Sequence, residues 1–284
     1  MSNFMPPAEL SRAFVNISKA KASNAASKLF VLGILAGVFI GFAAHLATTV
    51  ATGWTIGGAP ALFGFKKFLV GAVFSCGLML VMIPGSELWT GNTLMTIGLM
   101  NKDITLKALL RNWGIVYLGN FVGSIMLAWM IASMSGLTSG AVGGTALNIA
   151  YAKVTAGESA HNMWFFFRAI GCNWLVCLAV MMAVASKDIA GKVLAIFFPI
   201  MAFVTAGFEH VIANMYFIPA GIFSKGFEGA IAASGKTSAQ LVSLNWGSFF
   251  TQNLIVVTLG NLVGGGVFCG MVYWWIYVKG TKQA

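Results

Sequence analysis

Charged side chains are scarce in this sequence, and acidic side chains are the scarcest. Only 8% of the 284 residues are charged, with 7 Asp and Glu against 17 Lys and Arg, while 58% are hydrophobic. An ordinary soluble domain has about 25% charged residues. The composition therefore excludes a water-soluble enzyme. The net charge of +10 does not indicate nucleic-acid binding, because the cations flank apolar segments, where they orient a chain in a bilayer.

Cysteine and histidine are also few, which limits the chemistry that the chain can hold. The four cysteines lie inside apolar segments without metal-ligand spacing: Cys76, Cys172, Cys177 and Cys269. We expect buried apolar side chains there, with no metal site and no cofactor. A haem-carrying membrane subunit would need paired histidines, whereas only His210 lies in the middle of an interrupted apolar segment. A nucleotide-binding loop and a Ser-His-Asp order are lacking, so primary active transport and enzymatic activity are excluded.

What the sequence does contain is long uncharged segments. Residues 29–65, 113–152 and 237–278 have no Asp, Glu, Lys or Arg, and about 20 apolar residues are enough for a helix to cross a bilayer. Uninterrupted spans are predicted at Lys28 to Val50, Leu106 to Met134, Ala160 to Ser186 and Ser248 to Val278. Two longer segments are predicted to be broken spans with an acid near the middle: Phe68 to Asn101 around Glu87, and Val193 to Ser224 around Glu209.

Six spans place both ends of the chain on one side of the membrane. Eleven cations fall on that side and six on the other, so the positive-inside rule predicts cytoplasmic termini. We expect a cytoplasmic segment over residues 1–27, one channel domain over residues 28–279 and a cytoplasmic tail over residues 280–284. Before the first span, Leu10, Phe14 and Ile17 recur at helical spacing. This predicts an amphipathic helix in the membrane interface, with a partly ordered polar tail as the alternative.

Two short motifs occur twice in the same order. Residues 85–92 and 207–214 each contain a Gly, an acid two positions later and an Asn five positions after the acid, which are Glu87 with Asn92 and Glu209 with Asn214. Residues 118–123 and 259–264 both read Leu-Gly-Asn-x-Val-Gly. Two matches in register indicate an internal duplication, and because each half would hold three spans, the halves would have opposite orientations. Such an aquaporin-like inverted 3+3 repeat places the transport site near the midplane, where broken helices meet.

Proline and glycine explain how the two spans break. Pro84 and Gly85 are predicted to stop the second span, while Gly207 before and Pro219 to Gly221 after are predicted to bracket the break of the fifth. Non-helical backbone inside a membrane is tolerated only within protein or along a cavity. We interpret Glu87 and Glu209 as loop scaffold, each accepting hydrogen bonds from N–H groups of its own loop. An acid lining the pathway is the less favoured alternative, since it would repel an anion.

A few polar side chains could carry transport. His210 can change charge near neutral pH and can donate to an anion, and Thr90 at the other break could add a hydroxyl; a buried core histidine is the alternative. Lys153 ends a 40-residue uncharged segment and would concentrate anions at an outer mouth. Asn173 and Asn261 either donate to substrate or join helices. The large apolar side chains near the breaks, which can close a pathway to hydrated ions, are Phe74, Leu78, Leu88 and Phe203.

Four segments together closely resemble the formate/nitrite transporter family. They are Pro-Gly-Ser-Glu-Leu-Trp-Thr at residues 84–90, Gly-Phe-Glu-His-Val-Ile-Ala-Asn-Met at residues 207–215, and residues 172–180 and 253–261. The resemblance extends from about residue 8 to residue 279. It implies an aquaporin-like protomer of six spans, with the second and fifth broken, and a pentamer in which each protomer has its own pore.

The same resemblance implies roles for individual residues. His210 and Thr90 would form the central site, Lys153 would be the vestibule lysine, and Asn173 and Asn261 would be polar partners. The outer constriction would consist of Phe74, Leu78 and Phe203, and the inner constriction of Leu88.

The sequence thus predicts a bacterial inner-membrane channel or secondary transporter for small monovalent weak-acid anions. Formate is the leading substrate, and nitrite, hydrosulfide and short carboxylates such as lactate or acetate are the others. Between apolar rings, desolvation raises the pKa of the anion, so it would be protonated or held by His210, Thr90 and Asn173. The proton could come from His210 or from water. An aquaporin-like pore for neutral solutes is disfavoured because no Asn-Pro-Ala occurs.

Overall fold

Six apolar helical spans form the body of the protein in this computed structural model, which describes residues 4–56, 59–60, 62–155 and 161–280. Within these ranges the spans are Ala26–Val50, Phe63–Gly85, Leu106–Met134, Met163–Ala185, Ile189–Ala206 and Trp246–Tyr277. The predicted all-α membrane class is confirmed. Residues 281–284 of the predicted tail, and residues 156–160, which include the predicted start of the fourth span at Ala160, lie outside the described residues.

Four spans are continuous and pack in two pairs. α2 (Ala26–Val50) packs along α7 (Leu106–Trp129), which continues through a π-helical turn (Met130–Met134), and α9 (His161–Ala185) packs along α15 (Ile255–Leu262). The last span joins α14 (Trp246–Ser248), α15 and α16 (Val272–Tyr277) through π-helical turns at Phe249–Leu254 and Val263–Met271. A Cβ on Gly123 would overlap the backbone of α2 at Ile34, and one on Gly264 would overlap that of α9 at Ile170. The glycine that ends each repeated motif therefore permits close packing.

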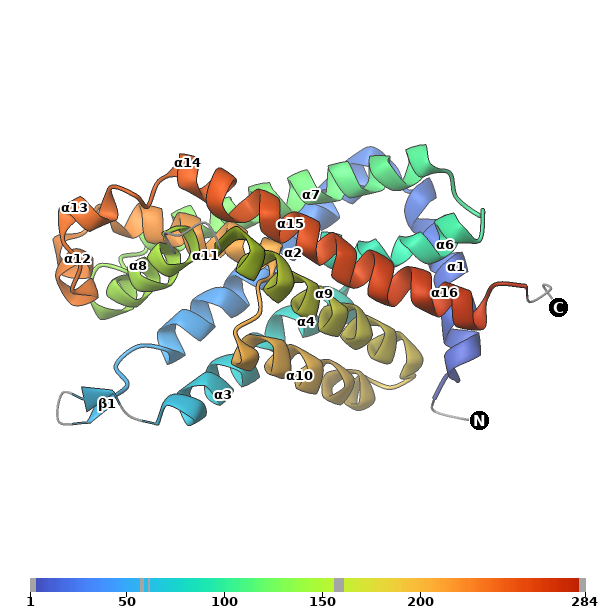
Figure 1. Ribbon diagram of the computed structural model, residues 1–284, viewed down its shortest axis with the longest axis horizontal. Coiled ribbons are helices and arrows are strands. Elements are labelled where there is room, and N and C mark those ends of the chain that lie inside the picture. Colours follow the sequence, from blue (N-terminus) through green and yellow to red (C-terminus); the bar gives the residue numbers. More distant parts are fainter. Residues whose placement is uncertain (1–3, 57–58, 61, 156–160, 281–284) are drawn as a thin grey trace.

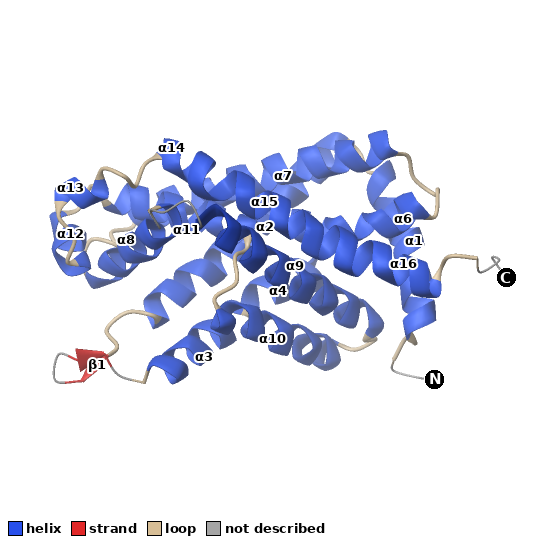
Figure 2. Cartoon of the chain, in the orientation of Figure 1, coloured by secondary structure: helices blue, strands red, loops and turns tan. Residues whose placement is uncertain are grey.

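The other two spans are broken at the predicted acids. α3 (Phe63–Phe74), α4 (Cys76–Leu80) and a π-helical turn (Val81–Gly85) precede the first break. α5 (Trp89–Asn92), a 3-10 turn (Thr93–Met95) and α6 (Thr96–Met100) follow it. α10 (Ile189–Ala206) and α11 (Val211–Ser224) flank the second break, which Figure 2 shows as a loop between helices. Gly85 and Gly207 have φ angles of +97° and +83°, so each break begins at a conformation that glycine adopts without strain.

Pro219 lies inside α11 and does not bracket the break, which differs from the sequence prediction. The helix runs through it from Val211 to Ser224. A proline removes only its own N–H, and membrane helices tolerate this where neighbouring groups satisfy the freed carbonyl. The break of the fifth span therefore consists of residues 207–210 alone.

Short elements gather at the two ends of the helical bundle. α8 (Ala141–Val154), α12 (Glu228–Ser234) and α13 (Ser238–Leu241) lie at one end, together with the antiparallel pair of β1 (Thr55–Ile56) and β2 (Ala59–Pro60). α1 (Pro7–Ser23) and α16 lie at the opposite end (Figure 1). The first and last helices are therefore on the same face, as an even number of crossings requires.

The helix predicted before the first span is α1, and its apolar stripe packs on protein; its position in the membrane interface stays a prediction. Leu10 and Phe14 of its apolar stripe are buried, and α1 contacts α6, α7 and α16. Ser18 lies directly over Gly98 of α6, where an added Cβ would overlap it. The helical spacing of the apolar stripe correctly predicted a helix. It could not distinguish a lipid surface from a protein surface, because an apolar stripe can pack on either.

An ion pair at the end of α1 predicts a pH dependence of its docking. Lys19 Nζ lies 2.5 Å from Asp103 Oδ1 in the loop before α7. Hydrogen bonds from Lys19 and Asn101 lower the pKa of Asp103 below its ordinary value of 3.8. Because this pKa is lowered in the folded state, the stabilisation is present above the ordinary value and is lost as the pH falls through the lowered value. A partly exposed pair of this kind at the protein surface contributes about 0.2–1 kcal/mol.

Hydrogen exchange in α1 tests this pair. At about pH 5, we expect the amides of α1 to exchange faster in Asp103→Asn than in the wild type, because only the wild type has the charged carboxylate. The two proteins should exchange alike once the pH is well below 3.8. Equal exchange at the higher pH would show that the pair does not hold α1.

Candidate functional site

The broken backbone of the second span is held by one buried asparagine from the third. Asn120 Oδ1 accepts the N–H of Trp89 at 2.9 Å, and Asn120 Nδ2 donates to the carbonyls of Gly33 and Glu87, both at 2.8 Å. The N–H of Glu87 donates to the carbonyl of Leu32 at 3.2 Å. These backbone groups are therefore satisfied by the first and third spans, as non-helical backbone inside a membrane requires.

The break of the fifth span has the same set of bonds. Asn261 Oδ1 accepts the N–H of Val211 at 2.9 Å, and Asn261 Nδ2 donates to the carbonyls of Ala169 at 2.8 Å and Glu209 at 2.9 Å. The N–H of Glu209 donates to the carbonyl of Arg168 at 3.3 Å. Asn261 and its counterpart in the other half are the asparagines of the repeated Leu-Gly-Asn motif, so this role explains the motif.

The acid of the first break binds side chains rather than the loop N–H groups that the sequence analysis expected. Glu87 Oε2 accepts from Lys21 Nζ at 2.7 Å and from Asn92 Nδ2 at 2.6 Å. Asn92 also donates to Asn112 Oδ1 at 2.9 Å, and Asn112 Nδ2 donates to the carbonyl of Lys21 at 3.1 Å. Because the loop N–H groups have other acceptors, the carboxylate can bind a cation and tie α1 to the break.

The acid of the second break is bound in the same way. Glu209 Oε2 accepts from Lys153 Nζ and from Asn214 Nδ2, both at 2.7 Å. Asn214 donates to Asn253 Oδ1 at 2.8 Å, and Asn253 Nδ2 donates to the carbonyl of Lys153 at 3.1 Å. Lys153 was predicted to attract anions, and that role stays a prediction. In the structure its ammonium is paired with a carboxylate, so much of its charge is offset.

Lys21 of α1 thus occupies in one half the place that Lys153 of α8 occupies in the other. Repeated bonding of this kind is what an internal duplication would produce, and the opposed orientation of the halves stays a prediction. The sequence did not indicate Lys21 as a site residue, because Lys21 lies outside every predicted span. Asn112 and Asn253 were also missed, although a signal was present: each precedes the asparagine of its Leu-Gly-Asn motif by 8 residues.

His210 and Thr90 meet between the two breaks. Thr90 Oγ1 lies 3.0 Å from His210 Nε2, and His210 Nδ1 accepts the N–H of Ala213 at 3.0 Å. A neutral imidazole has one proton, so a ring whose Nδ1 accepts a hydrogen bond carries that proton on Nε2. Nε2 then donates to Thr90 Oγ1, and the hydroxyl proton of Thr90 is available to donate to an anion. His210 and Thr90 are 3% and 0% exposed.

The side-chain amide of Asn173 bonds to other groups of the protein, among them the carbonyl of Thr90. Its Nδ2 lies 3.2 Å from the carbonyl of Thr90, 3.1 Å from Thr93 Oγ1 and 2.7 Å from the carbonyl of Asn261. Cys177 Sγ lies 3.4 Å from Thr93 Oγ1. Asn173 therefore positions Thr90 and joins the fourth span to the sixth. Of the two interpretations that the sequence left open for Asn173 and Asn261, these contacts favour helix joining.

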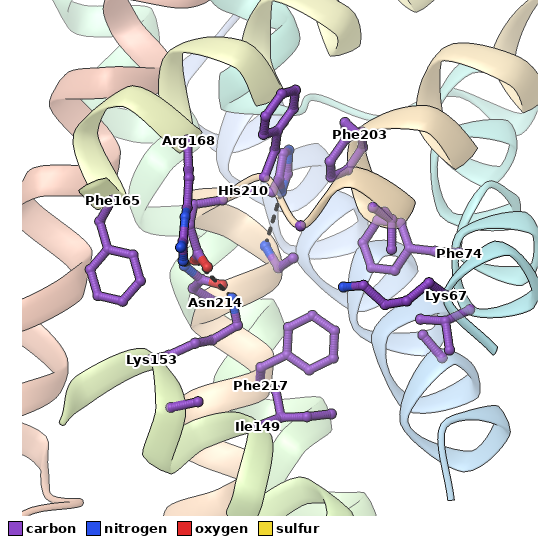
Figure 3. A pocket seen from close by; sticks show the side chains of 18 residues that line it. Lys67, Phe74, Ile149, Lys153, Phe165, Arg168, Phe203, His210, Asn214 and Phe217 are labelled. Carbon is purple, nitrogen blue, oxygen red and sulfur yellow. Dashed lines mark hydrogen bonds and ion pairs between the residues drawn. The ribbon is translucent and has the colours of Figure 1, made fainter. Parts of the chain in front are cut away.

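A cavity of about 300 Å³, here called the His210 cavity, opens beside this pair (Figure 3). Three cations line it, namely Lys67 of α3, Lys153 of α8 and Arg168 of α9, together with one acid, Glu209. In the sequence, Lys67 and Arg168 indicated only the orientation of the spans. Their place on the cavity follows from the packing of α3 and α9 against α10, which no sequence pattern indicated.

Aromatic rings line the His210 cavity next to the imidazole. The rings of Phe74 and Phe203 are 5.9 Å apart and meet edge to face at 84°, and Phe203 stacks on His210 at 5.9 Å. Phe217 stacks on Phe74 at 6.4 Å. Phe74 and Phe203 are each 3% exposed. Buried rings at this point can stop hydrated ions, and the constriction role of these two residues stays a prediction.

A second cavity, of about 190 Å³, lies on the side of α1 and is here called the Ser86 cavity. Ser86, Lys21, Leu78 and Leu88 are among the residues that line it, and it shares no lining residue with the His210 cavity. The resemblance had grouped Leu78 with the outer phenylalanines. Leu78 follows Phe74 by four residues, about 6 Å along a helix, which carries it to the side of Leu88.

These features define the class of the protein. One cavity is bordered by α1 and the other by α8, which lie at opposite ends of the bundle (Figure 1). Between them, two broken spans bring a buried histidine and threonine together. Broken helices that meet at a polar site inside a membrane bundle are typical of channels and secondary transporters.

Similarity to known proteins gives the family. The pattern of formate/nitrite transporters matches residues 8–275, and the chain belongs to this family of channels, which are not enzymes. The chain is 42% identical to the probable formate transporter of Methanothermobacter thermautotrophicus, over 98% of this chain and 99% of that protein. It is 35% identical to the formate channel FocA of Escherichia coli K12, over 96% and 94%. A solved pentameric formate channel with formate bound matches with a TM-score of 0.79 and 41% identity, covering 89% of this chain and 98% of that chain.

Proposed function

We propose that the protein passes formate across the bacterial inner membrane, as a homopentamer with one pathway in each protomer. The names of its relatives support formate, and the pentameric formate channel supports the assembly. The face with α1 and α16 is cytoplasmic in this proposal, because eleven of the 17 cations fall on that side of the predicted spans. Nitrite, hydrosulfide and short carboxylates remain alternative substrates.

The observation that carries the proposal is the donor pair at the closed centre of the pathway. An anion leaving the His210 cavity meets Phe74 and Phe203 and loses its water. Desolvation disfavours its charged form and raises its pKa, which assists its protonation by water. His210 Nε2 orients Thr90, and the Thr90 hydroxyl then donates to the carboxylate oxygen. A formate ion of three heavy atoms fits such a site better than lactate, which would bring a methyl group and a hydroxyl to the same rings.

His210 acts here as a fixed donor rather than as the source of the proton. Adding a proton to Nδ1 would break its bond to the N–H of Ala213 and place a charge on a ring that is 3% exposed. Burying an unpaired charge is costly. Water in the two cavities therefore supplies and removes the proton in this proposal.

Anion flux into proteoliposomes tests the function. The purified protein, whose native mass should correspond to five copies, is measured with formate, nitrite, hydrosulfide, lactate and chloride at about pH 5.5 and about pH 7.5. We expect formate to be the fastest, chloride to be excluded, and flux to rise at the lower pH because the neutral acid crosses the apolar segment. Water permeation without anion flux would instead support an aquaporin-like pore.

A further inference from the structure

The two cavities differ in charge, although their bonding networks correspond. Each contains one lysine that is paired with the acid of its break. The His210 cavity is also lined by Lys67 and Arg168. Among the described residues, neither of these lies within ion-pair distance of a carboxylate. Over the described residues, the lining of the His210 cavity therefore has a formal excess of two positive charges, which the Ser86 cavity lacks.

Lys67 is well placed to pass an anion to the constriction. Lys67, Val70 and Phe74 line the cavity from one face of α3, so Lys67 lies two helical turns, about 10 Å, before the ring of Phe74. Its Nζ lies beside Gly207 at the start of the second break, 3.7 Å from the position that a Cβ there would take. The bond from Thr205 Oγ1 to the carbonyl of Lys67, at 3.2 Å, fixes α3 at this point. Figure 3 shows the ammonium pointing into the cavity.

The excess charge lies at only one of the two cavities, although Lys67 on α3 and Arg168 on α9 come from different halves of the chain. The carbonyl of Arg168 accepts the N–H of Glu209, and in the other half the carbonyl of Leu32 accepts the N–H of Glu87. Leu32 is therefore the counterpart of Arg168, and it is uncharged. Lys21 is the one cation among the residues that line the Ser86 cavity. The asymmetry in charge consequently comes from the side chains of Lys67 and Arg168, whereas the repeated bond at Arg168 uses only its backbone carbonyl.

We propose that Lys67 is the capture site for small monovalent anions in the His210 cavity, with Arg168 adding to the attraction at its rim. The anion is held between the Lys67 ammonium and the cavity wall before it reaches Phe74 and Phe203. Lys153 keeps Glu209 compensated, so that this carboxylate does not cancel the charge of Lys67. The apparent affinity for anions is consequently higher from the face of α8 than from the face of α1. This inference rests on the proposed function.

Formate entry from each face, measured in right-side-out and inside-out membrane vesicles with isotope-labelled formate, tests the capture site. In Lys67→Gln we expect the half-saturating formate concentration to rise about three- to tenfold for entry from the face of α8 at low salt. For entry from the face of α1 it should not change, and the maximal flux should not fall, because a weaker site releases the anion more easily. A high concentration of impermeant salt should shrink the difference.

The neighbouring lysine provides a matched control. Lys66→Gln removes the same charge from the same turn of α3, but Lys66 does not line the His210 cavity. We expect Lys66→Gln to behave like the wild type. Lys67→Arg, which keeps the charge, should retain the wild-type half-saturating concentration and shows whether position 67 tolerates substitution.

The outcomes separate the two proposals. If the wild type passes no formate, the proposed function fails, and the capture site fails with it. If the wild type passes formate and Lys67→Gln saturates like Lys66→Gln, the function stands and the capture site is refuted. An equal rise in half-saturating concentration from both faces would also refute it, because Lys67 lines only one of the two cavities described above.

Discussion

Asn261→Ala should lower the free energy of unfolding by about 3–9 kcal/mol, since three buried backbone groups lose their partner at about 1–3 kcal/mol each. These groups are the N–H of Val211 and the carbonyls of Ala169 and Glu209. Asn261 is 0% exposed, so water cannot replace the amide without entering the packed bundle. For a protein of this size, the loss corresponds to a fall in melting temperature of about 10 °C or more.

Thermal unfolding in mild detergent, followed by size-exclusion chromatography, measures this loss. Asn120→Ala should have a similar effect, because Asn120 makes the equivalent three bonds in the other half. Leu259→Ala is the control, since Leu259 is on the same helix as Asn261 but 52% exposed. A stable Asn261→Ala protein with altered anion selectivity would instead place Asn261 on the substrate pathway.

The two broken spans could be predicted because their causes are local. Pro84 and Gly85, and Gly207 in the other half, stop a helix through their own backbone properties, and each acid within a long apolar segment marks a place that cannot face lipid. Pro219 misled the prediction for the same reason. A local signal indicates that a helix can end, whereas neighbouring spans decide whether it does, and in α11 it continues to Ser224.

The bonding partners could not be predicted because they join elements far apart in the chain. Lys21 and Glu87 are separated by 66 positions, and hydrophobic periodicity gives no information about such a pair. Asn173 was interpreted as a possible substrate donor because it is polar in an apolar span. The same property also describes a residue that satisfies a neighbouring carbonyl, and only the position of Thr90 and Asn261 distinguishes the two.

The central site was predictable in its residues but not in its protonation. The sequence placed His210 and Thr90 at the two breaks, and the structure brings them within 3.0 Å. Which ring nitrogen carries the proton depends on a third group, the N–H of Ala213, because it donates to Nδ1 and leaves the proton on Nε2. That bond caps α11, so helix formation and the state of the imidazole are coupled.

His210→Asn separates the donor role of the ring from its capping role. Asparagine is a favourable N-cap residue, so its side-chain oxygen can still accept the N–H of Ala213, but it is too short to reach Thr90. We expect the variant to fold with nearly wild-type thermal stability. Formate flux should fall about ten- to a hundredfold. The Thr90 hydroxyl would no longer be oriented toward the carboxylate, and a hydrogen bond to a charged group contributes about 1.5–3 kcal/mol. Thr90→Val, which removes the hydroxyl without changing the shape, should reduce flux to a similar extent.

The pH profile of the remaining flux then decides whether His210 supplies the proton. An imidazole in water changes charge near pH 6.5, whereas the ring of His210 is held neutral by its bond to Ala213. Flux through the wild type and His210→Asn, measured from about pH 5 to about pH 8, should therefore follow curves of the same shape that differ only in height. A step near neutral pH that is present in the wild type and lost in His210→Asn would show that the imidazole titrates during transport. In that case the proton would pass through His210, and the capping bond to Ala213 would have to open in each cycle.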